Sequence, residues 1–422
     1  MTAEITVLDN GIRVITDNMP QAESVALGMW VNAGAQNESK ENNGISHLLE
    51  HMAFKGTTTR TFKDIDEEIE NLGGSINAYT SREETAYYAR MLKENADTAM
   101  DIIGDILQNP TFPDEELKKE KTVIIQEINQ SYDTPDDYVF DLYQEKAFPN
   151  QPLGRPIAGL AENVKAFTRD DIQSYVAEQY VASQMVFSAA GNVNHDQIIG
   201  LAEKIFTKFP KKDKKLPVTP VYKGGDVRCE RDIEQLQLVL GFNGIPYNDE
   251  AYYAANIMAI ILGNSTTSRM YQEIREKRGL VYNIWSYPSF YRNAGMFNIY
   301  AGTSAESADE LIPAVGGEIR KITEYITPQE LARAKAQMKA NILMSLESSS
   351  SRCDKNARQM LIFNRLLTSE EMREKIEAVS ADDVLQVAAR IFSSEVTFAA
   401  LGRVKELKEP EAIRKDLGVS LT

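Results

Sequence analysis

Cysteine, histidine and tryptophan are scarce in this 422-residue sequence, which contains two cysteines, three histidines and two tryptophans. The cysteines, Cys229 and Cys353, show no metal-binding spacing, so we expect no disulfide framework and take a reducing compartment as the default. The longest apolar run, around residues 254–262, is far too short to span a bilayer. Residues 1–5 contain neither a secretory apolar core nor an arginine-rich presequence, so we expect no targeting segment there.

Positive charge is also in deficit, because 46 Lys and Arg residues stand against 62 Asp and Glu residues, for a net charge of −16 at pH 7. This imbalance argues against nucleic acids and anionic membranes as partners, and it is compatible with basic peptide substrates. With 43% hydrophobic and 26% charged residues, the composition is that of a globular protein. The length indicates two or more domains, because single hydrophobic cores stop growing well below it.

Two of the three histidines, His47 and His51, are four residues apart, and Glu50 directly precedes the second. On a helix this spacing places both imidazoles on one face, where they can bind one zinc ion while Glu50 accepts a proton from a zinc-bound water. This order is H-x-x-E-H. The same pattern also arises by chance, and a helix can carry two histidines for packing. The metal hypothesis therefore depends on a third protein ligand, which zinc needs if it is to keep an open position for water.

A long helix predicted from Pro113 to about Tyr132 carries Glu120 and Glu127, seven residues apart and nearly on one face. Glu127 lies in the otherwise apolar run 123–128, where a carboxylate is costly unless it is paired or bound to a metal. The alternative is a solvated glutamate at a helix edge. The remaining histidine, His195, lies at a predicted helix start, so we expect a surface cap there and not a ligand.

Other patterns predict alternating strands and helices along the chain. Strands at 5–8 and 12–16 flank Asn10-Gly11, a pair that accepts the positive φ of a tight hairpin turn. A hydroxyl residue opens the helix at 62–72, and Gly73-Gly74 ends it. Further strands are expected at 24–31, 75–80, 85–90 and 185–190, and further helices at 96–107 and 138–147.

The second half of the sequence resembles the first. Residues 166–172 recur as 378–384, each with a hydroxyl residue three before an aspartate, and residues 185–191 recur as 396–402. Between the halves, prolines and lysines are dense, which predicts a linker whose basic cluster is solvated. We therefore predict two copies of one α+β domain, at 1–210 and 228–422, with a linker at 211–227.

The second copy lacks the candidate metal residues. Aligning Leu117 with Leu331 places Ala334 opposite Glu120 and Asn341 opposite Glu127. The stretch 254–263, which aligns with the two-histidine motif, contains no histidine. One domain has thus kept the metal chemistry and the other has lost it.

Several features together make the chain resemble the pitrilysin-type zinc peptidases of the H-x-x-E-H (inverzincin) group. They are the His47–His51 motif, Glu127 downstream of it, the strand entry at 72–80 and the run at 274–282 in the second half. The resemblance is strongest to a short bacterial branch that is also similar to the β subunit of the mitochondrial processing peptidase. It implies an α+β fold of two homologous domains, each a mostly antiparallel sheet flanked by helices, which form a clamshell around a chamber.

The resemblance also implies roles for individual residues, with one zinc ion per chain. His47, His51 and Glu127 are the implied zinc ligands, and Glu50 is the implied general base. Glu120 is implied to orient the site, and Asn77 and Ala78 to bind the backbone of an extended substrate. Arg275 and Tyr282 are implied to bind the peptide carbonyl. Asp137 and Asp141 are implied to recognise a basic residue of the substrate.

The expected activity is that of a zinc metalloendopeptidase acting on extended oligopeptides or presequence-like peptides, with a preference for a basic residue near the cleavage site. We expect a homodimer in the bacterial cytoplasm, with no nucleic-acid or membrane partner. One alternative is a catalytically silent relative that binds peptides or serves as a structural subunit; such relatives typically lose a ligand or the base. A purely structural zinc site is the other, and it usually needs four protein ligands with cysteine among them.

Overall fold

The computed structural model describes residues 3–212 and 217–418, and its chain forms two compact units. The first unit comprises Met1–Asn129, Arg155–Val218 and Leu343–Thr368, and the second comprises Gln130–Gly154, Thr219–Ile342 and Ser369–Thr422. Each unit contains one mixed sheet with helices on its faces, so the predicted α+β class is confirmed. Of the predicted linker, residues 213–216 lie outside the described residues.

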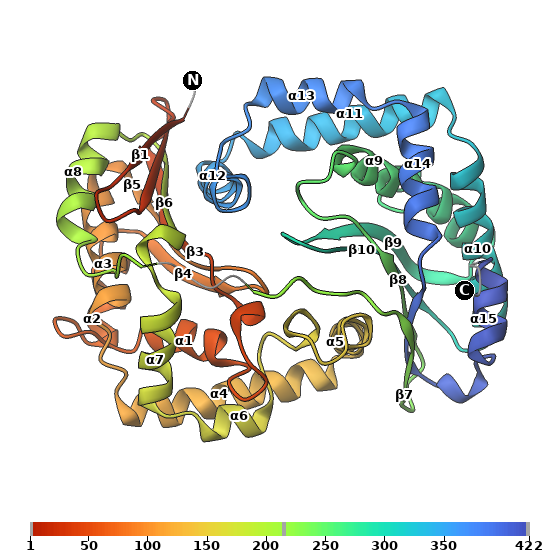
Figure 1. Cartoon of the computed structure of the whole chain (residues 1–422), viewed down its shortest axis with the longest axis horizontal. Coiled ribbons are helices and arrows are strands. Elements are labelled where there is room, and N and C mark those ends of the chain that lie inside the picture. Colours follow the sequence, from red (N-terminus) through yellow and green to blue (C-terminus); the bar gives the residue numbers. More distant parts are fainter. Residues whose placement is uncertain (1–2, 213–216, 419–422) are drawn as a thin grey trace. The chain divides into compact units, whose positions relative to one another are not determined.

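The first sheet has six strands in the order β1-β2-β6-β3-β5-β4 (Figure 1). All neighbouring pairs are antiparallel except β2 and β6, which are parallel. The predicted hairpin is confirmed, because β1 pairs with β2 across a turn in which Gly11 has a φ of 102°. The strands are β1 (Glu4–Val7), β2 (Arg13–Asn18), β3 (Ser24–Val31), β4 (Ser75–Thr80), β5 (Thr85–Leu92) and β6 (Met185–Gly191).

The second sheet repeats this topology without the first strand, in the order β7-β11-β8-β10-β9. Its one parallel pair, β7 and β11, corresponds to β2 and β6. Thr168 and Ser380 each accept a hydrogen bond from the backbone N–H three residues later, so the two aligned helix starts have the same cap. The predicted duplication is confirmed. The strands are β7 (Gly225–Glu230), β8 (Leu236–Asn243), β9 (Val281–Phe290), β10 (Gly295–Thr303) and β11 (Thr397–Gly402).

Helices cover one face of each sheet and enclose the main core of each unit. In the first unit, apolar residues of α1 and α3 pack with the inward side chains of β3, β5 and β6. The unit boundary falls within α4, after Asn129. Apart from α12 (Ser349–Phe363), the helices that begin in the first unit are α1 (Ile45–Ala53), α2 (Phe62–Glu70), α3 (Ala96–Gln108), α4 (Asp114–Asp133), α6 (Ala161–Ala166), α7 (Arg169–Gln179) and α8 (His195–Ile205).

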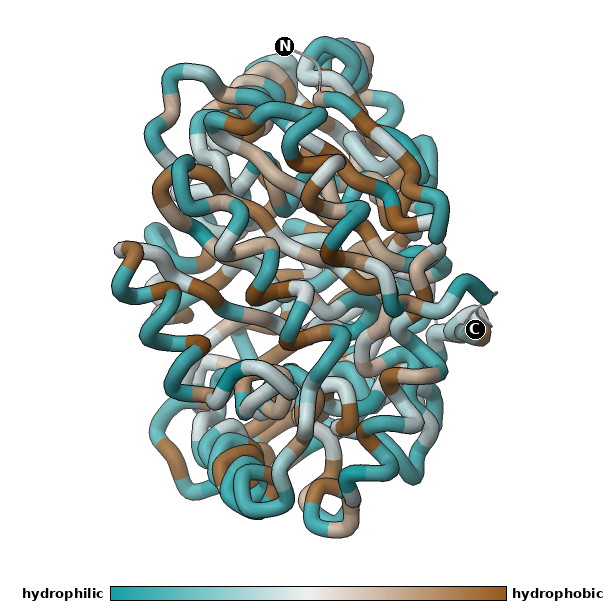
Figure 2. Tube along the Cα trace, turned by 90° about the vertical axis from the view of Figure 1, so that its left-hand side faces the viewer, coloured by the Kyte–Doolittle hydropathy of each residue, from teal (hydrophilic) through white to brown (hydrophobic). Residues whose placement is uncertain are grey.

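The second unit has the same layered construction, and its core lies between the sheet and helices such as α9, α10 and α14. Figure 2 shows that hydrophilic residues interrupt the hydrophobic ones at short intervals along the chain. Within the described residues, no helix is both long and apolar enough to cross a membrane. Apart from α5 (Pro135–Ala147), the helices are α9 (Tyr252–Leu262), α10 (Ala308–Glu324), α11 (Pro328–Ser345, which ends in the first unit), α13 (Ser369–Ala378), α14 (Ala381–Phe392) and α15 (Pro410–Leu417).

Each sheet is covered on its other face by a helix from the opposite half of the sequence. In the first unit, α12 (Ser349–Phe363) packs on β6 and β3 (Figure 1). There Cys353 Sγ donates a hydrogen bond to the carbonyl of Ser188. In the second unit, α5 (Pro135–Ala147) packs on β11 and β8, and Tyr143 Oη donates to Asn298 Oδ1. A simple division of the chain at the linker would assign α5 to the first unit and α12 to the second. In the structure each of these helices belongs to the other unit.

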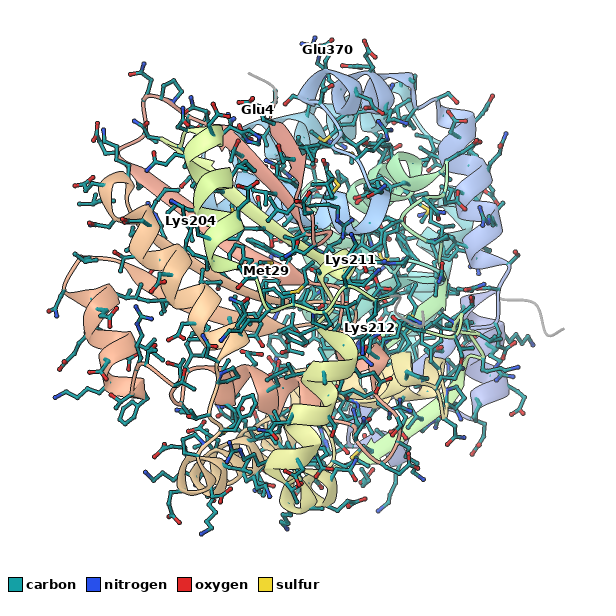
Figure 3. The ribbon with its side chains drawn as sticks, turned by 60° about the vertical axis from the view of Figure 1, so that its left-hand side comes forward. Glu4, Met29, Lys204, Lys211, Lys212 and Glu370 are labelled. Atoms are coloured by element: carbon teal, nitrogen blue, oxygen red, sulfur yellow. The ribbon has the colours of Figure 1, made fainter. Side chains whose placement is uncertain are left out.

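The basic segment after α8 is attached to the first unit, although its composition predicted a solvated connector. Figure 3 labels two lysines of this segment, Lys211 and Lys212. Their ammonium groups donate to the carbonyls of Asp9 and Ala177, at 2.9 and 2.7 Å. Lysine chains are long enough to keep a partly hydrated charge while they satisfy a backbone acceptor. These lysines are therefore engaged in holding the segment in place.

Candidate metal centre

The helix that carries the histidine motif begins at a glycine with no side-chain cap of its own. Gly44, the N-cap of α1, has a φ of 100°, and a Cβ at this position would lie 2.9 Å from the carbonyl oxygen of Ala158. Both the left-handed backbone and the close approach require glycine here. The first turn of α1 must therefore find its hydrogen-bond acceptor elsewhere in the chain.

That acceptor is Glu38, whose carboxylate is 3% exposed. Its Oε2 accepts hydrogen bonds from the N–H of Gly44 and from Asn43 Nδ2, and its Oε1 accepts from the N–H of Ser46, all at 2.8 Å. Burial raises the pKa of Glu38, while these hydrogen bonds and that with the Ser46 side chain oppose the rise. The positive end of the helix dipole also favours a carboxylate at this place. Glu38 thus fixes the turn that presents His47.

Replacing Glu38 with alanine is expected to destabilise the first unit by about 3 kcal/mol, because buried N–H donors lose their acceptor. The measurement is urea unfolding followed by the fluorescence of Trp30, in a chain whose other tryptophan, Trp285, is replaced by phenylalanine. Glu41→Ala is the matched control, since Glu41 is an exposed carboxylate in the same loop. Equal unfolding midpoints for the Glu38 and Glu41 variants would contradict the capping role.

Three side chains from two helices converge on one point in the first unit. Glu127 Oε2, on α4, lies 3.7 Å from His47 Nε2 and 3.5 Å from His51 Nε2, both on α1. The two imidazole rings meet edge to face, with centroids 4.7 Å apart. One ligand atom from each residue lies within 4.8 Å of the other two, so the three could hold a single metal ion. The Glu127 side chain is 43% exposed, which leaves this point open to water.

Glu120 lies about two helical turns before Glu127 on α4, and it holds the second histidine, His51, in place. Its Oε2 is 2.9 Å from His51 Nδ1, and its Oε1 is 2.8 Å from the ammonium of Lys55. Burial works against ionisation of Glu120, but the hydrogen bonds from Lys55 and His51 outweigh it and lower the pKa. A carboxylate that accepts the Nδ1 proton leaves the Nε2 lone pair directed toward Glu127, which is the tautomer that a metal requires.

Lys55 was absent from the residues expected at the site. Its position four residues after His51 would have been the only signal, and lysines at that spacing are common on helix surfaces.

The protonation states of the cluster suit a metal-binding site. Burial, together with the neighbouring His51, lowers the pKa of His47 to about 4, so its imidazole is neutral at physiological pH. Burial also raises the pKa of Glu50, against the effect of hydrogen bonding from Thr80, and the charge of Glu127 raises it further. Two imidazoles and one carboxylate match the donor set of catalytic zinc sites, which leave a fourth position free. The residues present therefore fit a zinc ion.

Asn77 and Ala78 lie on β4, an edge strand of the first sheet that also contacts α1. The N–H of Ala78 donates to Asn77 Oδ1 at 2.8 Å. This hydrogen bond satisfies the backbone donor of Ala78 on the edge strand.

The other four residues with implied roles belong to the second unit. Arg275 is in a π-helical turn, Tyr271–Lys277, where its guanidinium lies over the Tyr271 ring at 4.8 Å and its Nε donates to the carbonyl of Tyr282 at 3.1 Å. The Tyr282 side chain, on β9, is 62% exposed. Asp137 and Asp141 are one turn apart on α5, the first exposed and the second half-buried.

His195 differs from the expected surface cap. Its two ring nitrogens are each 2.8 Å from a threonine hydroxyl, Thr6 on β1 and Thr16 on β2. The cap of α8 is the preceding residue, Asn194, whose Oδ1 accepts from the N–H of Gln197. His195 therefore joins α8 to the sheet, a role that depends on which strands lie beside the helix and that no local pattern reveals.

The second repeat offers no comparable cluster within the described residues, where the three-residue group of His47, His51 and Glu127 is the one set able to hold a metal ion. At the aligned positions of α11, Ala334 is buried and Asn341 is exposed. The duplicated fold and the single cluster together define a two-domain protein in which one repeat carries a candidate metal site.

Comparison with known proteins identifies the family. Residues 13–160 match the family described as insulinase (peptidase family M16), and residues 166–338 match the family described as peptidase M16 inactive domain. An uncharacterized zinc protease of Rickettsia felis is 42% identical over 94% of this chain and 97% of its own length. The chain belongs to peptidase family M16.

Other relatives come from both bacteria and mitochondria. An uncharacterized zinc protease of Bacillus subtilis is 36% identical over 93% of this chain and 96% of its own length. A probable mitochondrial-processing peptidase subunit beta of Arabidopsis thaliana is 34% identical over 97% of this chain and 80% of its own length. The similarity to the bacterial branch and to the processing peptidase β subunit is thereby confirmed.

Solved structures show the same fold. A protease from Helicobacter pylori superposes with a TM-score of 0.87 at 21% identity, over 95% of this chain and 99% of that one. A structure titled peptidase M16 inactive domain, from Pseudomonas fluorescens, superposes with a TM-score of 0.89 at 19% identity, over 95% and 98% of the two chains. The predicted α+β fold with duplicated domains is confirmed.

Proposed function

We propose that this chain is a zinc-dependent endopeptidase that hydrolyses internal bonds of extended peptides. The observation that carries the proposal is the convergence of His47 Nε2, His51 Nε2 and Glu127 Oε2 on one point, with Glu50 on the same helix. Membership of a peptidase family and relatives named as zinc proteases support it.

In this proposal His47, His51 and Glu127 hold one zinc ion per chain. When bound, the ion supplies Lewis acidity and lowers the pKa of a water in its open position toward neutrality. The chain's own contribution is geometric: α1 and α4 bring the donors together, and Glu120 fixes the tautomer of His51.

Glu50 has the general-base role. Its pKa is raised by burial, which brings its proton affinity closer to that needed at neutral pH. It accepts a proton from the attacking water and passes it to the leaving amine of the cleaved bond. Thr80, which hydrogen-bonds to Glu50, keeps the carboxylate beside the end of β4.

The peptide is proposed to bind as an added strand on β4. An extended chain pairs with the backbone of an edge strand and thereby gains affinity that does not depend on its sequence. Asn77 and Ala78 offer a side-chain amide and a backbone N–H there, once the bond between them opens. Arg275 and Tyr282 are proposed to bind the peptide carbonyl, the tyrosine stabilising the developing oxyanion. Asp137 and Asp141 are proposed to favour a basic residue near the cleavage site.

The function is tested by peptide cleavage and metal analysis on the same preparation. The wild-type chain is expected to contain one zinc per chain, to lose cleavage of a fluorogenic peptide library when a chelator removes the metal, and to regain it when zinc is restored. Mass spectrometry of the products then shows whether cuts lie near arginine or lysine. A chain that binds zinc and cleaves no peptide would instead be the catalytically silent relative.

Replacing Glu120 with glutamine is expected to weaken zinc binding roughly 10- to 100-fold, because the histidine loses the carboxylate that orients it. Competition with a chromogenic chelator measures the dissociation constant. The matched control is Glu115→Gln, since Glu115 is an exposed carboxylate in the first turn of the same helix. Unchanged affinity in the Glu120 variant would remove Glu120 from the site.

We further propose a homodimer located in the bacterial cytoplasm. The relatives named as β subunits make a separate partner chain the alternative arrangement. Light scattering of the purified chain at working concentration separates the two: twice the chain mass supports the homodimer, and a monomer contradicts it.

A further inference from the structure

Some of the polar contacts of helix α12 are with β4, the strand that is proposed to bind substrate. Asp354, on α12, accepts hydrogen bonds through Oδ1 from Tyr79 Oη at 3.1 Å and from Trp30 Nε1 at 3.2 Å. Tyr79 is on β4 and Trp30 is on β3, and all three residues belong to the first unit. A residue from the second half of the sequence thus contacts the edge strand of the first sheet.

A second contact from α12 reaches the turn that follows β4. Arg358 Nε lies 2.8 Å from Glu84 Oε1, and Glu84 is 6% exposed. Tyr79 Oη is 3.2 Å from the same Glu84 oxygen and 3.2 Å from Trp30 Nε1. Burial raises the pKa of Tyr79, and the charges of Glu84 and Asp354 raise it further, so the phenol keeps its proton and remains a donor. The β4–β5 hairpin is therefore tied to α12 at two points.

The opposite face of β4 is turned toward the candidate metal centre. Successive side chains of a strand point to opposite faces, so Thr80 faces away from the side on which Tyr79 meets α12. Thr80 hydrogen-bonds to Glu50, and its Oγ1 lies 3.5 Å from the carbonyl of Ser46 on α1. Strand β4 is held between α12 on one face and the motif helix on the other.

An edge strand needs such support if it is to bind an extended peptide tightly. Within the described residues β4 is hydrogen-bonded to one neighbouring strand, β5, so half of its backbone groups lack a strand partner. A strand that is ordered before the peptide arrives loses less entropy on binding. The side-chain contacts of Tyr79 with Asp354 and Glu84 therefore help to order β4, a role that a second neighbouring strand would otherwise have.

We propose that Tyr79 and Asp354 are positioning residues that hold β4 ready for the substrate backbone. The inference rests on the proposed peptidase function, and it assigns a task to the half of the chain that lost the metal. Neither residue touches the reacting atoms. Their effect is expected in the affinity for peptide, with zinc binding and the chemical step retained.

The structure also provides a matched control on the same helix. Asn356 Nδ2 donates to Asp17 Oδ2 at 3.1 Å, and Arg352 Nη1 donates to Asp17 Oδ1 at 3.0 Å. Asp17 is on β2, and the strand order places β6, β3 and β5 between β2 and β4. Asn356→Ala therefore removes a buried α12-to-sheet hydrogen bond without touching β4.

The experiment compares Tyr79→Phe, Asp354→Ala, Asp354→Asn and Asn356→Ala in the full zinc-loaded chain. Tyr79→Phe and Asp354→Ala are expected to raise KM for an extended peptide roughly tenfold, because a tenfold loss of affinity corresponds to about the free energy of one hydrogen bond to a charged group. The kcat of both variants is expected to stay within about twofold of the wild-type value. Asp354→Asn keeps an acceptor oxygen and is expected to restore most of the affinity. Asn356→Ala is expected to lower Tm while leaving KM unchanged.

Amide hydrogen exchange in the absence of peptide gives a readout that does not need activity. The Tyr79 and Asp354→Ala variants are expected to exchange faster over residues 75–80, and the Asn356 variant is not. Wild-type KM and wild-type exchange over β4 in Tyr79→Phe would overturn the inference while leaving the peptidase proposal intact. If the wild-type chain binds zinc yet cleaves nothing, the peptidase proposal fails, and the exchange comparison still decides whether α12 orders β4.

Discussion

Replacing Glu50 with glutamine is expected to lower kcat for peptide hydrolysis by about 10²- to 10⁴-fold, the range that a positioned general base contributes. Glutamine has nearly the same shape and can still meet Thr80, so α1 and its two histidines stay in place. The amide cannot accept a proton at neutral pH. Zinc content is therefore expected to remain at one per chain.

The measurement pairs single-turnover peptide cleavage with zinc analysis of the same samples. Because Glu50 is not among the converging donor atoms, lost turnover with retained metal separates the base from the ligands. Turnover that stays near the wild-type value would assign the base elsewhere. Loss of zinc together with turnover would place Glu50 among the ligands and contradict the geometry of the site.

Glu127→Ala is expected to have the largest effect on metal binding, a loss of zinc affinity greater than the roughly 10- to 100-fold that outer-shell changes cost. Glu127 supplies a carboxylate oxygen that faces both Nε2 atoms, at 3.7 and 3.5 Å. Two imidazoles alone leave the ion with too few protein ligands for a catalytic site. Hydrolysis is expected to disappear at zinc concentrations that saturate the wild type.

Gln126→Ala is the matched control for this prediction, because Gln126 is the exposed neighbour of Glu127 on α4. Titration with zinc against a chelator gives both dissociation constants. Recovery of activity at high zinc concentration in the Glu127 variant would agree with weakened binding. Wild-type zinc affinity in that variant would show that the third ligand is another residue.

The fold could be predicted where the signal was local. Asn10-Gly11 marks its hairpin because few residue pairs adopt the backbone of that turn, and Thr168 and Ser380 mark helix starts because their hydroxyls cap the next turn. The spacing of His47 and His51 places both on one helix face for the same local reason. The recurrence of such local signals at matching places in the two halves revealed the duplication.

Features that depend on distant packing could not be predicted. The capping of α1 by Glu38 is seen only once the preceding loop is folded against the helix, and the sequence shows an ordinary acidic residue in a polar loop. The exchange of α5 and α12 between the two halves leaves no local pattern, because an amphipathic helix does not show which sheet it will cover. The bond between Asp354 and Tyr79 follows from that exchange.

The duplication has thus produced two different contributions to one proposed activity. The first repeat keeps the donor cluster on α1 and α4, while the second has Ala334 and Asn341 at the aligned positions. The second half nevertheless supplies α12, which ties down the strand beside the cluster. Loss of metal chemistry in one copy is compatible with retention of its structural contribution to the other.

Anomalous X-ray diffraction across the zinc absorption edge, from crystals of the Glu50→Gln chain grown with an extended peptide, tests the central claim most directly. The account predicts one zinc peak among His47 Nε2, His51 Nε2 and Glu127 Oε2, at about 2.0–2.2 Å from each, with the peptide paired along β4. A zinc peak elsewhere, or no peak between the imidazoles, would contradict it.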